Sequence, residues 1–196
     1  MSMETENVLP PESNHSNVVM LCCNDYDVDR IQECLLRGID MLGGIHHFVQ
    51  PGEHLLLKPN LLSGKVPDKA VTTHPAVFQA VASLFKSAGA TLSYGDSPGF
   101  GRSASVATRA GLAEVAEQLN ITLADFQNGR TVSFPEGRLC KQFFIAEGAL
   151  NADGIISLPK LKTHALTRMT GAVKNQFGCV PGMLKGEFHG RFNKVD

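Results

Sequence analysis

Three apolar stretches of the sequence each end in side chains that could do chemistry. Residues 54–60 (HLLLKPN) end in a lysine and an asparagine, and residues 90–99 (ATLSYGDSPG) end in an aspartate, a serine and a glycine. Residues 154–164 (GIISLPKLKTH) end in two lysines, a threonine and a histidine. Amines bind phosphates and carboxylates, whereas histidine titrates near neutral pH and can transfer protons. A buried strand needs none of these groups, so their recurrence predicts one site for a small anionic ligand.

The residue types divide the predicted site between ligand binding and catalysis. Lysines would bind the anion, and amide, hydroxyl and glycine positions would orient it through hydrogen bonds. The predicted ligand-binding residues are Lys58, Asn60, Thr73, Ser97, Gly99, Lys160, Lys162, Thr163, Lys174 and Asn175. His74, His164 and Asp96 are the candidates for proton transfer. A lysine packed beside other cations would have a lowered pKa and could act as a base or a nucleophile.

The last part of the sequence is rich in basic residues. From residue 158 to residue 194 there are seven Lys or Arg and one carboxylate, Glu187, although the whole chain has 18 Lys plus Arg against 19 Asp plus Glu. The same segment is rich in glycine, which allows the backbone to approach a ligand closely. This local excess of positive charge predicts that the segment binds phosphate or carboxylate groups.

Hydrophobic patterns indicate the elements that would position these groups. Short apolar runs predict buried strands at residues 17–23, 54–60, 90–96, 121–126 and 154–158. Apolar residues spaced three and four apart predict helices over residues 27–42, 72–88 and 102–119. The alternation predicts an α/β fold with a mostly parallel sheet, helices on both faces and a small β-hairpin insertion at residues 131–146. The polar strand ends would then converge on one edge of the sheet, beside the helix start at residues 72–74.

Length and composition limit the number of domains and the kind of partner. The 196 residues allow a flexible tail at residues 1–16 and a single α/β domain over residues 17–196, which we expect to be incomplete at its C-terminus. A net charge of −1 argues against nucleic acid and membrane surfaces as partners. The sequence shows neither an apolar run long enough to span a membrane nor a secretory signal, so we expect a cytoplasmic protein.

The ordered motifs of the chain resemble those of a known family. They are KPNLL (58–62), TTHP (72–75), GDSPG (95–99), LPKLKTH (158–164), TGAVKNQFG (170–178) and a K-x-x-x-H pair formed by Lys185 and His189. From residue 17 to the end, the sequence is similar to a prokaryotic family of uncharacterised iron–sulfur-associated proteins, the domain of unknown function numbered 362. Members of that family usually continue further, and many carry a ferredoxin-like pair of four-cysteine motifs. The resemblance therefore implies a truncated member without the ferredoxin-like segment.

The cysteines bear on which cofactor the chain could hold. The five cysteines include no C-x-x-C pair, so the sequence identifies no cofactor of this chain. The resemblance implies a [4Fe-4S] cluster only in a missing segment or on a ferredoxin-like partner. A metal site is a separate hypothesis, because histidine, aspartate and thiolate side chains suit zinc, nickel or iron. Its candidate ligands are His74, His164, His189, Asp96 and Cys179.

Three functions stay open from the sequence. The first is an enzyme, or the substrate-binding part of one, that acts on a small anionic molecule, with a redox version in which a ferredoxin module supplies electrons. The second is a non-catalytic electron-transfer or docking module that uses the basic edge to bind an acidic partner. The third is a metal-binding protein. Shape separates the first two: a flat basic patch favours docking, whereas an enzyme is favoured by a concave pocket that holds Lys58, His74, Asp96, Lys160 and His164.

Overall fold

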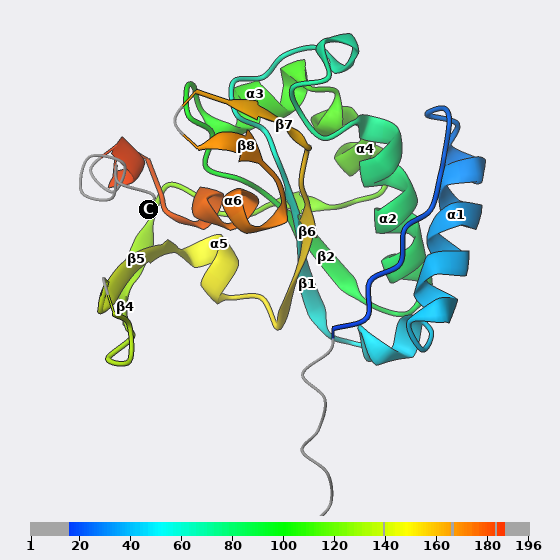
Figure 1. The fold of residues 1–196 in the computed structure, drawn as a ribbon, viewed down its shortest axis with the longest axis horizontal. Helices are drawn as coiled ribbons and strands as arrows, with labels where there is room; N and C mark the ends of the chain where they lie inside the picture. The colour runs from blue at the N-terminus through cyan, green and yellow to red at the C-terminus, as the bar shows by residue number, and fades with distance from the viewer. Residues whose placement is uncertain (1–15, 139, 166, 183, 187–196) are drawn as a thin grey trace, which may run out of the picture.

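A four-stranded parallel sheet forms the centre of the computed structural model (Figure 1). The structure describes residues 16–138, 140–165, 167–182 and 184–186. The strand order across the sheet is β3 (Thr122–Leu123), β2 (Thr91–Tyr94), β1 (His54–Pro59) and β6 (Gly154–Leu158). Every pairing is parallel, and Leu55 of β1 lies opposite both Leu92 and Gly154. The carboxyl ends of β1, β2 and β6 therefore lie at one edge of the sheet.

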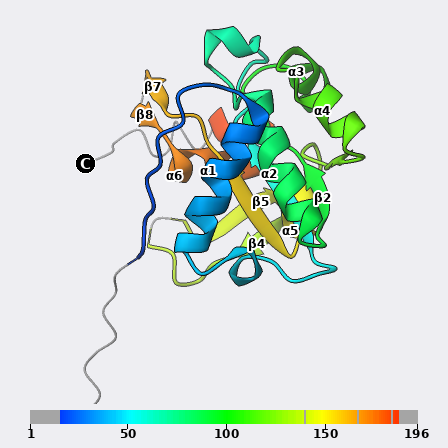
Figure 2. The ribbon, with the colours of Figure 1, turned by 90° about the vertical axis from the view of Figure 1, so that its right-hand side faces the viewer.

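Helices cover both faces of this sheet (Figures 1 and 2). One side carries α1 (Val28–Met41), α2 (Pro75–Ser87) and α4 (Leu112–Gln118), and the other carries α5 (Glu147–Leu150) and α6 (Ala172–Gln176). Leu55 and Leu57 of β1 belong to the larger core with Phe78 of α2, whereas Leu56 belongs to a second core with Phe126. Successive residues of β1 are thus buried on opposite faces, which explains the unbroken apolar run. The predicted α/β fold is confirmed.

The starts of the long helices follow from local hydrogen bonding. α1 begins after Asp27, whose carboxylate accepts a hydrogen bond from the backbone N–H of Arg30 at 3.0 Å. α2 begins at Pro75, where the missing N–H costs little. Its N-cap is His74 rather than a threonine, and the His74 Nδ1 accepts from the backbone N–H of Ala76 at 3.1 Å. The helix expected over residues 72–88 is therefore present, but it begins later, and the expectation that Thr72 or Thr73 caps it is wrong.

The first predicted strand, residues 17–23, is wrong. The segment has no regular structure and runs along α1 instead of joining the sheet (Figure 2). Val18 is 81% exposed, whereas Val19 and Leu21 pack over Gly38 of α1. The places beside β1 are taken by β2 and β6, and within residues 17–23 Val19 alone is partly buried. Hydrophobicity alone does not show whether an apolar run joins a sheet.

The helix predicted over residues 102–119 is interrupted. α3 (Ser103–Arg109) is followed by a separate α4, and Gly111 between them has a φ of 75°. Glycine adopts this left-handed conformation without a steric penalty. A Cβ at Gly111 would lie 3.0 Å from Cγ of Pro75, so the break also lets the start of α2 approach closely. The strand predicted over residues 121–126 is reduced to the two residues of β3.

Two antiparallel hairpins accompany the sheet. β4 (Gly129–Ser133) and β5 (Gln142–Ala146) form the hairpin that the sequence predicts. β7 (Lys162–His164) pairs with β8 (Arg168–Thr170) directly after β6, where the sequence shows no clear periodicity. Short 3-10 helices complete the described elements: η1 (Ile45–His47), η2 (Pro67–Lys69) and η3 (Phe177–Cys179). In the part of the chain that the structure describes, no helix is both long and apolar enough to cross a membrane.

Candidate functional site

A buried ion pair lies beneath the carboxyl edge of the sheet. Lys58 at the end of β1 is 0% exposed, and its Nζ donates to Oδ1 of Asp96 at 2.8 Å. The other carboxylate oxygen of Asp96 accepts a hydrogen bond from the backbone N–H of Leu61 at 2.9 Å. A buried charge is tolerated only when it is paired and hydrogen-bonded, and both conditions hold here. The pair therefore fixes the chain after β1 against the chain after β2.

α6 is attached to the same ion pair through Asn175. The Nδ2 of this buried amide donates to the carbonyl of Lys58 and to Oγ of Ser157, both at 3.0 Å. Gly178 follows three positions after Asn175, and its carbonyl accepts a hydrogen bond from the backbone N–H of Ser97 at 3.1 Å. A Cβ at Gly178 would lie only 1.9 Å from a carboxylate oxygen of Asp96, so glycine is required there. These contacts bring segments far apart in the sequence to one edge of the sheet.

A cleft of about 550 Å³ opens beside the ion pair. It is bounded by the loops after β1 and β2, by the β7–β8 hairpin and by α6 with the chain that follows it. Eight residues predicted from the sequence line it: Asn60, Asp96, Ser97, Gly99, Lys162, His164, Lys174 and Asn175. Lys185 lines it as well. Three strand ends that are distant in the sequence thus supply one concave surface, as the parallel topology predicts.

The lysines of the cleft are positioned by neutral groups. Lys162 Nζ donates to Oδ1 of Asn60 and to the carbonyl of Val71, each at 2.5 Å. Lys185 Nζ donates to the carbonyl oxygens of Ser97 and Pro98. Among the described lining residues, Asp96 is the one carboxylate, and Lys58 already neutralises it. The surface of the cleft is therefore cationic, which suits an anionic ligand.

Burial changes the titration of these groups. It lowers the pKa of Lys185 from 10.5 to about 8, and it also lowers the pKa values of Lys162 and Lys174. Burial is also the main reason why the pKa of His164 is lowered, followed by the charges of Lys174 and Lys162. An amine or imidazole that loses its proton near neutral pH can act as a general base. The cleft thus combines ammonium groups with Lys185, whose pKa lies closer to neutral pH than that of an ordinary lysine, and with the imidazole of His164.

The remaining predicted residues lie outside the cleft lining. Lys58 is buried below it, and Thr73 is buried with its Oγ1 donating to the carbonyl of Leu158. The ring of His74 stacks on Tyr26 at 3.6 Å between centroids, and Lys160 Nζ donates to the Tyr26 hydroxyl at 3.1 Å. Thr163 is exposed in β7, and His189 lies outside the described residues. Five residues were expected to share a concave pocket. Of these, Asp96 and His164 line the cleft, whereas Lys58, His74 and Lys160 do not.

Some cleft residues have no assigned role in the sequence-based prediction. Lys185 appears there only as a basic residue and as the lysine of the K-x-x-x-H pair, and the aromatic rings of Phe100 and Phe177 have no role at all. Phe100 belongs to the turn-rich loop of residues 97–101, and Phe177 follows Asn175 by two positions. The sequence offered two signals for these residues. Lys185 lies in a glycine-rich segment, and Phe100 lies between two glycines. Neither signal shows which surface the side chain faces.

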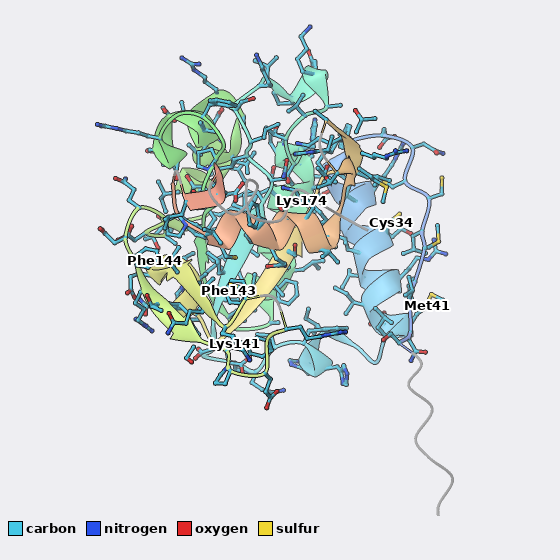
Figure 3. The ribbon with its side chains drawn as sticks, turned by 60° about the vertical axis from the view of Figure 1, so that its left-hand side comes forward. Cys34, Met41, Lys141, Phe143, Phe144 and Lys174 are labelled. Atoms are coloured by element: carbon cyan, nitrogen blue, oxygen red, sulfur yellow. The ribbon has the colours of Figure 1, made fainter. Side chains whose placement is uncertain are left out.

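The described residues offer little for a metal or a cluster. They include no group of three or more His, Cys, Asp or Glu side chains that could hold a metal ion. Cys179 is buried, and burial raises the pKa of its thiol. Cys22 and Cys23 are exposed in the segment beside α1, and Cys34 lies on α1 (Figure 3). A four-thiolate site does not fit this arrangement of the described residues.

Comparisons with known proteins agree with the motifs. The family model described as "Domain of unknown function (DUF362)" matches residues 55–196. A thylakoid-associated protein of Synechocystis sp. is 41% identical over 177 residues, which cover 88% of this chain and 53% of that relative. The chain thus spans about half the length of the curated relative that it matches. No solved structure matches it.

Proposed function

The chain belongs to the family described as a domain of unknown function, DUF362, and from the geometry of its cleft we propose that it binds a small anionic molecule and exchanges a proton with it. One observation carries the proposal. Lys162, Lys174 and Lys185 line a single concave cavity in which the one lining carboxylate of the described residues is already paired. A charge-assisted hydrogen bond contributes about 1.5–3 kcal/mol, so two or three such bonds give specific binding of a small anion.

His164 is the candidate best placed for proton exchange. His74 is engaged as the cap of α2 and Asp96 in the buried ion pair, whereas His164 lines the cleft. The backbone N–H of Thr167 donates to Nδ1 of His164 at 3.2 Å. The neutral ring therefore carries its proton on Nε2, and the protonated ring carries one on each nitrogen.

The shape of the cleft favours ligand binding over partner docking as its main use. A flat basic patch would suit an acidic protein, but these lysines lie around a cavity large enough for a small molecule. In the redox version of the proposal, a ferredoxin-like partner with a [4Fe-4S] cluster supplies electrons to the bound molecule. The support for that version is the family resemblance of the motifs, and the chemistry of the cleft supports anion binding independently of it.

Calorimetric titration with inorganic sulfate tests the proposal. Sulfate keeps its charge around neutral pH, so changes in affinity report on the protein. Replacing Lys162 with Met should weaken sulfate binding by about tenfold or more, because a charge-assisted hydrogen bond is lost. His164→Gln should leave the affinity at pH 8 nearly unchanged but remove the gain in affinity that protonation of the ring gives at lower pH.

Lys65→Met is the matched control for these variants. Lys65 is an exposed lysine outside the cleft lining, so its loss should change sulfate affinity by less than about twofold. Equal affinities in wild type, Lys162→Met and Lys65→Met would contradict the proposal. So would the absence of any heat of binding in a folded wild-type protein.

A further inference from the structure

The cleft has a second chemical character beside its positive charge. Leu62, Phe100 and Phe177 line the same cavity as the lysines. A site that held only a phosphate-sized or carboxylate-sized anion would not need this much apolar surface. These side chains would contact a part of a ligand other than its charged group.

Phe100 and Leu62 are unusually accessible for residues of a ligand cavity. Phe100 is 78% exposed and Leu62 is 37% exposed. Single exposed apolar residues are common on protein surfaces, so exposure alone carries no meaning. Here Gly99 and Gly101 flank Phe100 and have no side chains that could cover its ring. The ring therefore remains available to whatever enters the cleft.

The two loops that carry these side chains are tied together. The carbonyl of Leu62 accepts hydrogen bonds from the backbone N–H of Gly99 at 2.8 Å and of Phe100 at 3.3 Å. Leu62 also has a φ of 44°, a left-handed conformation that is unfavourable for a branched side chain. Such strain persists where the surrounding structure enforces it, and it is concentrated at functional sites. These hydrogen bonds thus fix the backbone of the two loops at the points that carry Leu62 and Phe100.

The charged and apolar parts of the cleft meet at α6. Lys174 projects from α6 (Figure 3), and its Nζ lies 4.7 Å from the centroid of the Phe177 ring. A cation over an aromatic face is held by electrostatic attraction, which orients the ammonium group. A ligand head bound at Lys174 would therefore lie beside the Phe177 ring, in the same cavity that Phe100 and Leu62 line.

We propose that the cleft selects anions that carry an aromatic or other flat apolar body, the anionic head bound by Lys162, Lys174 and Lys185 and the body packed against Phe100 and Leu62. This inference rests on the proposed function, since it names the class of molecule that the same site would take. Aromatic rings pack favourably in offset or edge-to-face arrangements, which explains why an exposed phenylalanine serves this role.

Methyl phosphate and phenyl phosphate are suitable probes, because they share a head group and differ in the body. In calorimetric titrations at one pH, phenyl phosphate should bind wild-type protein roughly tenfold more tightly than methyl phosphate, owing to the apolar area that it buries. Phe100→Ala should remove most of this preference and leave the affinity for methyl phosphate within about twofold. Phe134→Ala is the matched control, since Phe134 is an exposed phenylalanine outside the cleft lining.

The outcomes separate this inference from the proposal beneath it. If methyl phosphate and phenyl phosphate bind wild type equally, or if Phe100→Ala keeps the preference for the phenyl ester, the inference is wrong and the proposed anion site stands. If neither ester nor sulfate binds, the proposed function itself fails. A loss of preference in Phe134→Ala equal to that in Phe100→Ala would also overturn the inference, because the ring would then be recognised elsewhere.

Discussion

Lysines at the carboxyl edge of the sheet fall into two regions with opposite surroundings. Lys58 is fully buried and lies 2.8 Å from the carboxylate of Asp96. Lys162, Lys174 and Lys185 line the cleft, and none of the ion pairs found in the described residues involves them. One charge is therefore neutralised inside the protein, and the others are available to a ligand. Lysines at one edge of a sheet can therefore either stabilise the fold or face a ligand cavity, according to whether a carboxylate accompanies them.

The largest expected effect comes from breaking the buried pair. Lys58→Met would leave the Asp96 carboxylate buried without a counter-charge, which costs about 3–5 kcal/mol of unfolding free energy. Urea denaturation followed by circular dichroism measures this loss. The double variant Lys58→Met/Asp96→Leu removes both charges and should recover much of the stability.

Lys162→Met serves as the comparison from the other region. Its side chain reaches the cleft and pairs with neutral oxygens, so we expect a loss of no more than about 1.5 kcal/mol. If Lys58→Met and Lys162→Met lose the same stability, the division between the two regions is wrong. The double variant would contradict the division as well if it were no more stable than Lys58→Met alone.

A smaller loss of stability should follow from a substitution at Gly178, where the buried ion pair meets the cleft. Gly178 lines the cleft, and a Cβ added there would lie 1.9 Å from Oδ1 of Asp96 and 2.6 Å from Nζ of Lys58. Gly178→Ala must displace one of these atoms, and we expect a loss of about 1–3 kcal/mol in urea denaturation. Gly171→Ala is the matched control, because a Cβ there meets no atom within 4 Å and φ is −157°. An equal loss in both variants would show that glycine flexibility, not the ion pair, sets the cost.

The sheet edge could be predicted from the sequence because it depends on repeated local patterns. The apolar runs that end at Lys58 and Leu158 pair in parallel through β1 and β6, and the intervening helix pattern places α2. The prediction fails at residues 17–23, where the same kind of pattern gives no strand. An apolar run does not show whether a segment joins a sheet, and most of this one stays exposed beside α1.

The composition of the site could be predicted only in part. Strand position placed Lys162 and His164 at the edge of the sheet, and both line the cleft. Residue type does not show that Lys58 is paired with Asp96, because that contact joins residues 38 positions apart. The role of Gly178 depends on the same long-range contact, so no local pattern contains it.

The smallest expected effect is a dependence of sulfate affinity on pH, which distinguishes Lys185 from the other lysines of the cleft. Burial lowers the pKa of Lys185 to about 8, so its ammonium is present below that pH and is lost above it. Sulfate affinity should therefore fall severalfold between about pH 7 and pH 9, and Lys185→Met should flatten this part of the profile. Lys65→Met should keep the fall.

The free energy of unfolding should rise with pH, whereas sulfate affinity falls, and the rise should occur over a higher range of pH. Between about pH 8 and pH 10.5 the unfolded chain holds the Lys185 proton more strongly than the folded chain, so the free energy of unfolding rises with pH. Below about pH 8 both states are protonated, and the cost of burying the charge is present in full. Because the side chain is partly accessible, the rise should amount to less than about 1 kcal/mol. If Lys185→Met shows the same pH profiles of affinity and stability as wild type, Lys185 does not bind the anion in the cleft, and Lys162 and Lys174 alone carry the charge.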